Sequence, residues 1–335
     1  MSTRHTRQFS RRRFLGGVML AGTGGLLGWY PRPVAAEPPP ETTTIRLVRY
    51  PFDITCVAPQ WVAEELLRAE GFSTVEYVQT TDSALLLATG EVDMALLDAP
   101  GLVLLLDAAK PIVTLTGVHG GCYELFATDS VQSVRDLRGR TVAALSTAYQ
   151  AFVAAMVSYV GLDPRKDITF VVEPEAMQLF IEGKVDAILG FPPVPQELRA
   201  RKIGHSVVNT TLDRPWSQYF CCMAVATREF VRKHPVATKR ALRALVKATD
   251  VCAAEPEQVA RILIDRGFAK NYEATLQVLR EIPYRRWREY DSADTIRFMA
   301  LRMHEAGVIK SSPQKLIAEG TDWRFLNALK KELKD

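Results

Sequence analysis

Apolar and polar residues follow the same order of elements in two long stretches of the chain. In the first, alternating or apolar strand patterns are separated by helix patterns, which gives strands at 44–50, 74–79 and 92–97 and helices at 59–70 and 82–90. In the second, strands are expected at 141–145, 168–172 and 185–189, and helices from 146 or 147 to 161 and at 175–182. Each stretch therefore predicts a β-α-β-α-β unit, whose apolar strands are typical of a parallel sheet covered by helices on both faces.

The last strand of each unit carries the clearest sign of repetition. "GEVDMALLDAP" (Gly90–Pro100) and "GKVDAILGFPP" (Gly183–Pro193) share a glycine, a charged residue, Val-Asp, an apolar run and a proline at the same spacing. We interpret the repeat as two α/β lobes. Ligands of open parallel sheets bind beyond the carboxyl ends of the strands, so Asp98–Pro100 and Gly190–Pro193 are expected to line one cleft between the lobes.

The remaining segments predict how the two lobes are joined. A strand pattern at 122–128 leaves the first lobe, and another at 218–226 returns to it. Helix patterns follow, and we expect them to pack back onto the first lobe, at 228–233, 235–254, 256–266, 272–281, 292–306 and around 313–333. The predicted organisation is lobe 1 at 44–125 and 220–335, and lobe 2 at 126–219.

The first 36 residues are typical of an export signal rather than of the fold. Twin arginines occur within Ser10–Leu15, a glycine-rich apolar run follows over Gly16–Trp29, and Val34-Ala35-Ala36 offers small residues for cleavage. A membrane anchor is disfavoured because the apolar span is short and rich in glycine. Residues 1–36 are therefore interpreted as a twin-arginine signal peptide, and the mature protein is expected in the periplasm.

The predicted signal peptide also changes the charge of the protein. It contains six of the 42 Lys and Arg and none of the 38 Asp and Glu, so 36 basic side chains remain from Glu37 onward against 38 acidic ones. The mature net charge is then −2 instead of +4. This balance gives no indication of nucleic-acid or membrane binding.

Candidate ligand-binding residues lie in the loops at the strand ends, among them Pro51–Ala58, Thr80–Ser83 and Gly117–Glu124. Hydroxyls at the start of a helix can bind a ligand or only cap the helix, aromatic rings can line a slot or fill the core, and carboxylates can bind ligand donors or shape turns. No catalytic residue is assigned. The predicted ligand-binding set is Phe52, Asp53, Thr55, Thr81, Asp98, Ser146, Thr147, Tyr149, Phe191, Trp216 and Tyr219.

Five cysteines without a CxxC motif exclude a dense disulfide framework. Cys221-Cys222, with Cys122 and His119 expected nearby, suggests either a thiolate metal site or buried thiols. Adjacent residues of a regular strand point to opposite faces, which makes the pair a poor chelate, so no metal and no cofactor are assigned. A bridge from Cys122 to Cys221 or Cys222 stays open, but we expect free thiols because a cross-link would stiffen the hinge.

The order of several short motifs resembles one family of transport proteins. They are Gly121–Ala127, Val134–Ala143, Gly183–Ala187 and Arg228–Pro235, spread over most of the chain from about Thr44. The chain is similar to periplasmic solute-binding proteins of the nitrate, sulfonate and taurine ABC importers, which include pyrimidine-precursor binders related to thiamine biosynthesis proteins. The resemblance implies an α/β fold of the two-lobed type II periplasmic binding class, with two hinge strands and a helical C-terminal part on lobe 1.

That resemblance implies capture of a small solute and its delivery to a membrane permease. The protein is expected to act as a monomer. The first cleft loop, Pro51–Pro59, departs from the small-residue stretch common in the family, so the ligand does not follow from the resemblance. The aromatic and acidic loop content favours a small heteroaromatic or amine-bearing solute over nitrate or a bare sulfonate. The alternatives are an enzyme on the same scaffold, similar to pyrimidine-precursor synthesis, or a module that senses a ligand for a membrane receptor.

Overall fold

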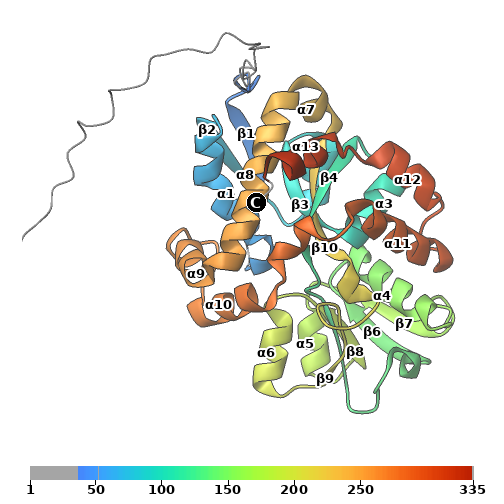
Figure 1. The fold of residues 1–335 in the computed structure, drawn as a ribbon. Helices are drawn as coiled ribbons and strands as arrows, with labels where there is room; N and C mark the ends of the chain where they lie inside the picture. Colours follow the sequence, from blue (N-terminus) through green and yellow to red (C-terminus); the bar gives the residue numbers. More distant parts are fainter. Residues whose placement is uncertain (1–36, 52, 334–335) are drawn as a thin grey trace, which may run out of the picture. The chain divides into compact units, whose positions relative to one another are not determined.

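Two lobes, each with sheets and helices, make up the chain from Pro38 onward, which forms one compact unit (Figure 1). The computed structural model describes residues 37–51 and 53–333. The predicted signal peptide at 1–36 and the candidate residue Phe52 lie outside the described residues. Within the described part, no helix combines the length and apolar character needed to cross a membrane.

Lobe 1 contains five strands in two sheets, and its elements from β1 to β3 follow the predicted order. Parallel β1 and β2 pair with each other, and β10 lies between β3 and β4, antiparallel to both. The bounds are β1 Thr44–Arg49, η1 Thr55–Val57, α1 Ala58–Ala69, β2 Thr74–Gln79, α2 Ser83–Thr89, β3 Met94–Asp98, α3 Ala99–Asp107, β4 Ile112–Gly120 and β10 Phe220–Thr227.

Lobe 2 is built on one five-stranded sheet in the order β7-β6-β8-β5-β9. Its β6, β7 and β8 run parallel, and β5 is antiparallel to β8. The bounds are β5 Glu124–Ala127, η2 Val134–Leu137, β6 Arg140–Ala144, α4 Thr147–Tyr159, β7 Ile168–Val172, α5 Ala176–Ile181, β8 Ala187–Gly190, α6 Val194–Arg201, β9 His205–Asn209 and η3 Trp216–Gln218.

The repeated Val-Asp dipeptide joins the strands of each lobe in the same way. The Asp93 carboxylate accepts the backbone N–H of Arg46 at 2.8 Å and pairs with the Arg46 guanidinium at 2.6 Å. Asp186 likewise accepts the N–H of Thr141 at 2.8 Å and pairs with Arg140 at 3.2 Å. The preceding glycines end their helices with φ of 77° at Gly90 and 67° at Gly183, a left-handed conformation that favours glycine.

Two segments cross between the lobes and are bonded to each other. Gly121 to Tyr123 leads from β4 to β5, and the return segment begins at Thr210 after β9. The N–H groups of Cys122 and Tyr123 donate to the Thr210 hydroxyl at 3.1 and 2.9 Å, and the N–H of Thr210 donates to the Tyr123 carbonyl. A side chain at Gly121 would meet the Thr210 carbonyl oxygen at 2.3 Å, so glycine permits this close approach.

The C-terminal helices pack onto lobe 1 as expected, and α8 lies along α1 (Figure 1). They also reach lobe 2, because α11 contacts both α3 and α4, and Glu281 of α10 accepts from Gln196 of α6 at 2.7 Å. The bounds are α7 Arg228–Lys233, α8 Pro235–Ala254, α9 Pro256–Asp265, α10 Tyr272–Glu281, η4 Tyr284–Arg288, α11 Ser292–Glu305, α12 Pro313–Gly320 and α13 Arg324–Glu332.

Two of the predicted cleft loops prove to be regular structure instead. Asp98–Pro100 ends β3 and opens α3, where the Asp98 carboxylate caps the helix by accepting from the Gly101 N–H at 2.8 Å. The predicted loop Gly117–Glu124 is β4 as far as Gly120, and β4 is buried along its whole length. Asp98 does end its strand as predicted, but α3 and β4 were not predicted, because the apolar runs that form them do not alternate and so do not reveal whether they form a buried strand or helix.

Candidate functional site

The two lobes bring aromatic and acidic side chains together where the carboxyl end of β3 faces the start of α4. Tyr149 in the first turn of α4 packs edge-to-face against Tyr123 at 5.3 Å between ring centres, and lies 5.4 Å from the ring of Phe191. Asp98 of lobe 1 is close enough to both tyrosines to raise the pKa of each phenol, after the larger effect of burial. We call Asp98, Tyr123, Tyr149 and Phe191, with Tyr50 of lobe 1, the cleft cluster.

Burial dominates the chemistry of the Asp98 carboxyl. Removal from water raises its pKa from 3.8 to about 6, although the Gly101 N–H stabilises the charged form and the Cys56 thiol opposes it. Burial likewise raises the pKa of Tyr50, whose hydroxyl bonds Ser83. A carboxyl with a pKa of about 6 changes its protonation near neutral pH, so Asp98 can offer either a carboxylic acid donor or a carboxylate acceptor to the cleft cluster.

The start of α4 supplies a second polar feature beside the cleft cluster. Ser146 occupies the capping position with extended backbone angles, as expected, but its side chain makes no capping bond. Neither its hydroxyl nor that of exposed Thr147 bonds a described protein group. The first N–H groups of a helix and two hydroxyls are therefore available at the point where the ring of Tyr149 enters the cluster.

Trp216 and Tyr219 belong to a different part of the lobe junction. Trp216 is buried and packs edge-to-face against Phe152 of α4 and Phe298 of α11, each at 5.5 Å. Tyr219 also contacts this group, since its ring stacks on that of Phe298 with 4.0 Å between the ring centres. Both line a small apolar cavity that also contains Tyr123 and Pro100, so they adjoin the cleft cluster through Tyr123.

The other predicted residues are not brought into the cleft cluster by described contacts. Asp53 accepts from the Lys270 N–H at 3.1 Å and so fixes the loop before α10. Thr55 is buried in η1, where its carbonyl accepts from the Tyr284 hydroxyl at 3.2 Å. Thr81 is exposed at the start of α2, two residues from the Ser83 that bonds Tyr50.

Four cysteines and a histidine gather behind the cleft cluster, contrary to the argument that Cys221 and Cys222 must point apart. The register of β10 against β4 shifts on both sides of Cys222, as in a β-bulge, which breaks the alternation of side chains. The two sulfurs lie 4.0 Å apart, and Cys221 Sγ is 2.9 Å from Cys122 Sγ. All five cysteines of the chain are buried free thiols in the structure.

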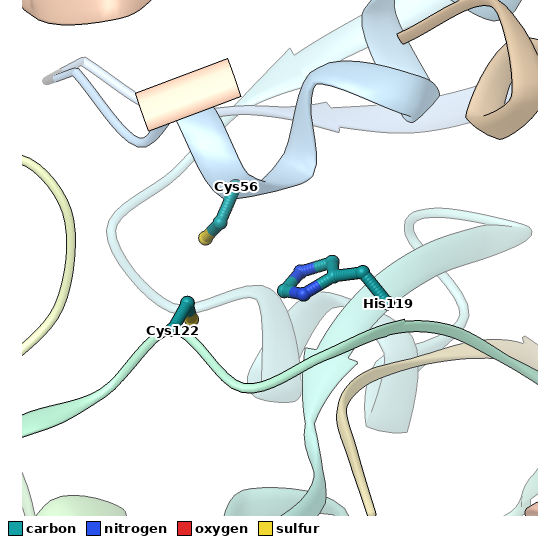
Figure 2. Close-up of side chains that lie close together, drawn as sticks. All are labelled: Cys56, His119 and Cys122. Atoms are coloured by element: carbon teal, nitrogen blue, oxygen red, sulfur yellow. The ribbon is translucent and has the colours of Figure 1, made fainter. Parts of the chain in front are cut away.

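Cys56 of η1 is the fourth cysteine of this group. Its place there was not predicted from the sequence. Its Sγ, a ring nitrogen of His119 and Cys122 Sγ lie within 4.8 Å of one another, and so do the donor atoms of His119, Cys221 and Cys222 (Figure 2). We call these five residues the thiol cluster. Interactions with the Cys122 and Cys222 thiols hold the pKa of the Cys56 thiol well below its usual value, whereas burial raises the pKa of the Cys221 thiol.

Tyr50 and Tyr123 of the cleft cluster were also missed as individual residues. Tyr50 follows β1 directly and Tyr123 precedes β5, so both occupy strand ends, the positions at which ligands of such sheets bind. Position was therefore the available signal, but no side-chain pattern separated these two tyrosines from aromatic residues that fill the core.

The fold is that of a two-lobed type II periplasmic binding protein, and similar solved structures agree. The periplasmic nitrate-binding protein NrtA from Synechocystis PCC 6803 superposes with a TM-score of 0.73 over 88% of this chain and 90% of that chain, at 16% identity. The alkanesulfonate-binding protein SsuA from Xanthomonas axonopodis pv. citri, bound to MOPS, gives 0.68 over 86% and 100%, also at 16% identity. A desulfurization enzyme, DSZB, gives 0.55 over 87% and 99% at 17% identity.

The sequence identifies the family directly. The family model described as NMT1/THI5 like matches residues 69–259, more than half of the chain. The protein therefore belongs to the NMT1/THI5-like family, which confirms the family relationship predicted from the sequence motifs. No curated protein sequence matches the chain.

Proposed function

We propose that the protein captures a small organic solute between its lobes in the periplasm and delivers it to the membrane permease of an ABC importer. The family and the fold support this, because structures of the same fold include a nitrate-binding and an alkanesulfonate-binding periplasmic protein. The proposed lobes are the predicted 44–125 with 220–335, and 126–219, with the first boundary moved to the start of β5, because this strand pairs with β8 and β9 of lobe 2. The protein acts as a monomer on a solute rather than on nucleic acid.

The observation that carries the proposal is the composition of the cleft cluster. Asp98 and Tyr50 come from lobe 1, and Tyr149 and Phe191 come from lobe 2, so a solute held among them would contact both lobes at once. Such a solute makes more contacts when the lobes are closed on it than when they are open. Its binding therefore favours closure, which is the physical basis of capture by hinge motion.

The same residues favour a planar solute that carries hydrogen-bond donors, such as a nitrogen heterocycle or an aromatic amine. Aromatic edges and faces of Tyr123, Tyr149 and Phe191 suit a flat ring, and Asp98 can accept from an N–H group. Ser146, Thr147 and the start of α4 suit an acceptor group at the other end of the solute. Of the predicted set, Asp98, Ser146, Thr147, Tyr149 and Phe191 are proposed as direct contacts.

A thermal-shift screen of purified protein tests this function. Pyrimidines and other nitrogen heterocycles are compared with taurine, alkanesulfonates and nitrate, since a ligand at a hundred times its Kd adds about 2.7 kcal/mol to stability. We expect heterocycles to raise Tm and Asp98→Asn to reduce that rise. As a control, Asp136→Asn alters an exposed carboxylate of lobe 2 that accepts the Ser133 N–H at 2.9 Å, and this variant should bind like the wild type. Stabilisation by sulfonates or nitrate alone would contradict the ligand class, and stabilisation by no solute would contradict capture.

An enzyme on this scaffold is the second candidate, because a desulfurization enzyme shares the fold and Cys56 has a depressed pKa beside His119. A low-pKa thiol next to a histidine is a common arrangement for nucleophilic catalysis. Prolonged incubation of the protein with each stabilising solute, followed by mass spectrometry of the solute, separates the two. Recovery of unchanged solute supports transport, whereas a converted product supports catalysis.

Export by the twin-arginine route is a further part of the proposal and rests on the Ser10–Leu15 motif. Replacing both Arg11 and Arg12 by Lys should leave the precursor in the cytoplasm, since the translocation pathway reads the arginine pair. Cell fractionation and immunoblotting measure the distribution. Arg4→Lys lies outside the motif and should not alter export, and normal periplasmic accumulation of the double variant would contradict this route.

A further inference from the structure

The thiol cluster has the donor chemistry of a metal site. Every donor is a cysteine sulfur or an imidazole nitrogen, and the five side chains are 0–6% exposed. Soft sulfur ligands with imidazole select thiophilic cations such as Cu(I) and Zn(II) over cations that prefer oxygen. The donors form two groups of three that share His119, with all donor atoms of a group within 4.8 Å of one another.

His119 is oriented as a metal ligand is. Its Nδ1 lies 2.9 Å from the Gly120 carbonyl oxygen, to which it donates, so Nε2 carries the lone pair. This Nε2 is buried and has no hydrogen-bond partner among the described residues. An unsatisfied buried acceptor is costly. Histidines that bind metal commonly donate their other ring N–H to a backbone carbonyl, which fixes the tautomer and the ring orientation.

The fold assembles these donors from segments that are far apart in the sequence. Cys56 comes from η1, His119 from the end of β4, Cys122 from the outgoing crossing segment, and Cys221 and Cys222 from the bulge of β10. Figure 2 shows the side chains of Cys56, His119 and Cys122 close together, each from a different segment, with Cys122 below Cys56 and the His119 ring pointing toward both. The cluster therefore lies at the base of the lobe junction, beside the crossing segments rather than within the cleft cluster.

We propose that the thiol cluster binds one thiophilic d10 cation, Cu(I) or Zn(II), through Cys56, His119 and Cys122, with Cys222 as a further donor. Three soft ligands suit Cu(I), which accepts fewer ligands than tetrahedral Zn(II), and recruitment of Cys222 suits Zn(II). The cation joins lobe 1 at η1 to the outgoing crossing segment. This site is independent of solute capture, because it uses no member of the cleft cluster, and a metal-bound Cys56 would not be free to act as the nucleophile of the alternative enzyme.

Metal binding is tested on purified, reduced protein without oxygen, so that the thiols of Cys122 and Cys221 stay free. Cu(I) is titrated against a chromophoric Cu(I) chelator, and Zn(II) against a chromophoric Zn(II) chelator, in separate experiments. We expect one equivalent of at least one of the two ions per chain. Cys56→Ser and His119→Gln should each weaken binding by roughly tenfold or more, as the loss of a ligand or its support does.

Cys252→Ser is the matched control, because Cys252 is equally buried but lies in α8, outside both donor groups. Its affinity should equal that of the wild type. X-ray absorption of the metal-loaded wild type keeps the test decisive if the cluster variants do not fold, and it should show sulfur and nitrogen neighbours. Failure of both ions to bind, an unchanged affinity in folded cluster variants, or an oxygen-only ligand shell would overturn the proposal.

Discussion

At the scale of single residues, Asp98 combines a structural role with a chemical one. Its carboxylate accepts the Gly101 N–H and so caps α3, while burial removes it from water. The capping bond favours the charged form, and burial favours the neutral form more strongly. The ionised carboxylate therefore destabilises the folded protein, and this cost is complete once the pH has risen above about 6.

Asp98→Asn should reveal this cost as a change in pH dependence. The carboxyl binds its proton more tightly in the folded protein, with a pKa of about 6 against 3.8. Its contribution to stability is thus complete below about pH 4 and is lost as the pH rises through 6. Asparagine can still accept from the Gly101 N–H but does not ionise. The unfolding free energy of the variant, relative to that of the wild type, should therefore rise by roughly 3 kcal/mol between pH 4 and pH 7.

Urea unfolding at several pH values measures that difference. Asp82→Asn provides the comparison, because Asp82 caps α2 in the same manner but is exposed to solvent, and its replacement should have a small effect. A constant difference between Asp98→Asn and the wild type over this range would show that burial does not control the carboxyl.

Residue-level prediction from the sequence succeeded where a helix start dictates the residue type and was incomplete where distant segments meet. The helix predicted to begin at residue 82 is α2, which Asp82 caps by accepting the Leu85 N–H. Cys56 was not associated with Cys122, because 66 positions separate them and only the approach of η1 to the crossing segment brings them together. Local patterns contain no information on such pairings.

At the scale of elements, periodicity located most helices and strands but did not show which side chains would share a face. The strands β2 and β7 and the helices α7, α8 and α10 have the predicted bounds, because caps, glycines and prolines mark their ends. The bulge in β10 was not predicted, and with it the common direction of Cys221 and Cys222. A bulge depends on the partner strand and leaves little trace in the sequence.

The two Val-Asp joints allow a matched comparison at this scale. Asp93→Ala and Asp186→Ala each leave a first-strand N–H without its acceptor and an arginine without its partner. We expect losses of about 2–4 kcal/mol in unfolding free energy. The loss should be larger for Asp93, whose side chain is 10% exposed against 28% for Asp186.

Chemical denaturation of the folded variants measures both losses. Asp213→Ala removes an exposed carboxylate that accepts the Asn209 N–H at 2.7 Å and should cost less than about 1 kcal/mol. Equal effects in all three variants would contradict the idea that the repeated dipeptide joins the strands of each lobe.

At the scale of the whole molecule, the C-terminal helices couple the two lobes. Glu281 of α10 accepts from Arg199 and Gln196 of α6, while Arg199 also pairs with buried Glu124 of β5. We call this set the α6–α10 contact. Since α10 packs against η1 and α9, the contact fastens lobe 2 to the part of the protein that carries lobe 1.

Glu281→Ala should therefore shift the lobes toward an open arrangement. The substitution removes the acceptor for Arg199 and Gln196 but leaves Arg199 paired with Glu124. Glu281 is partly exposed, so the lost contacts amount to about 1 kcal/mol, which corresponds to a roughly threefold to tenfold weaker affinity for a solute that requires closure. Small-angle X-ray scattering of the solute-free protein should show a larger radius of gyration. Glu257→Ala breaks a comparable ion pair with Arg280 inside the C-terminal helices and should change neither quantity. If both variants bind solute and scatter alike, the α6–α10 contact does not control the opening of the cleft.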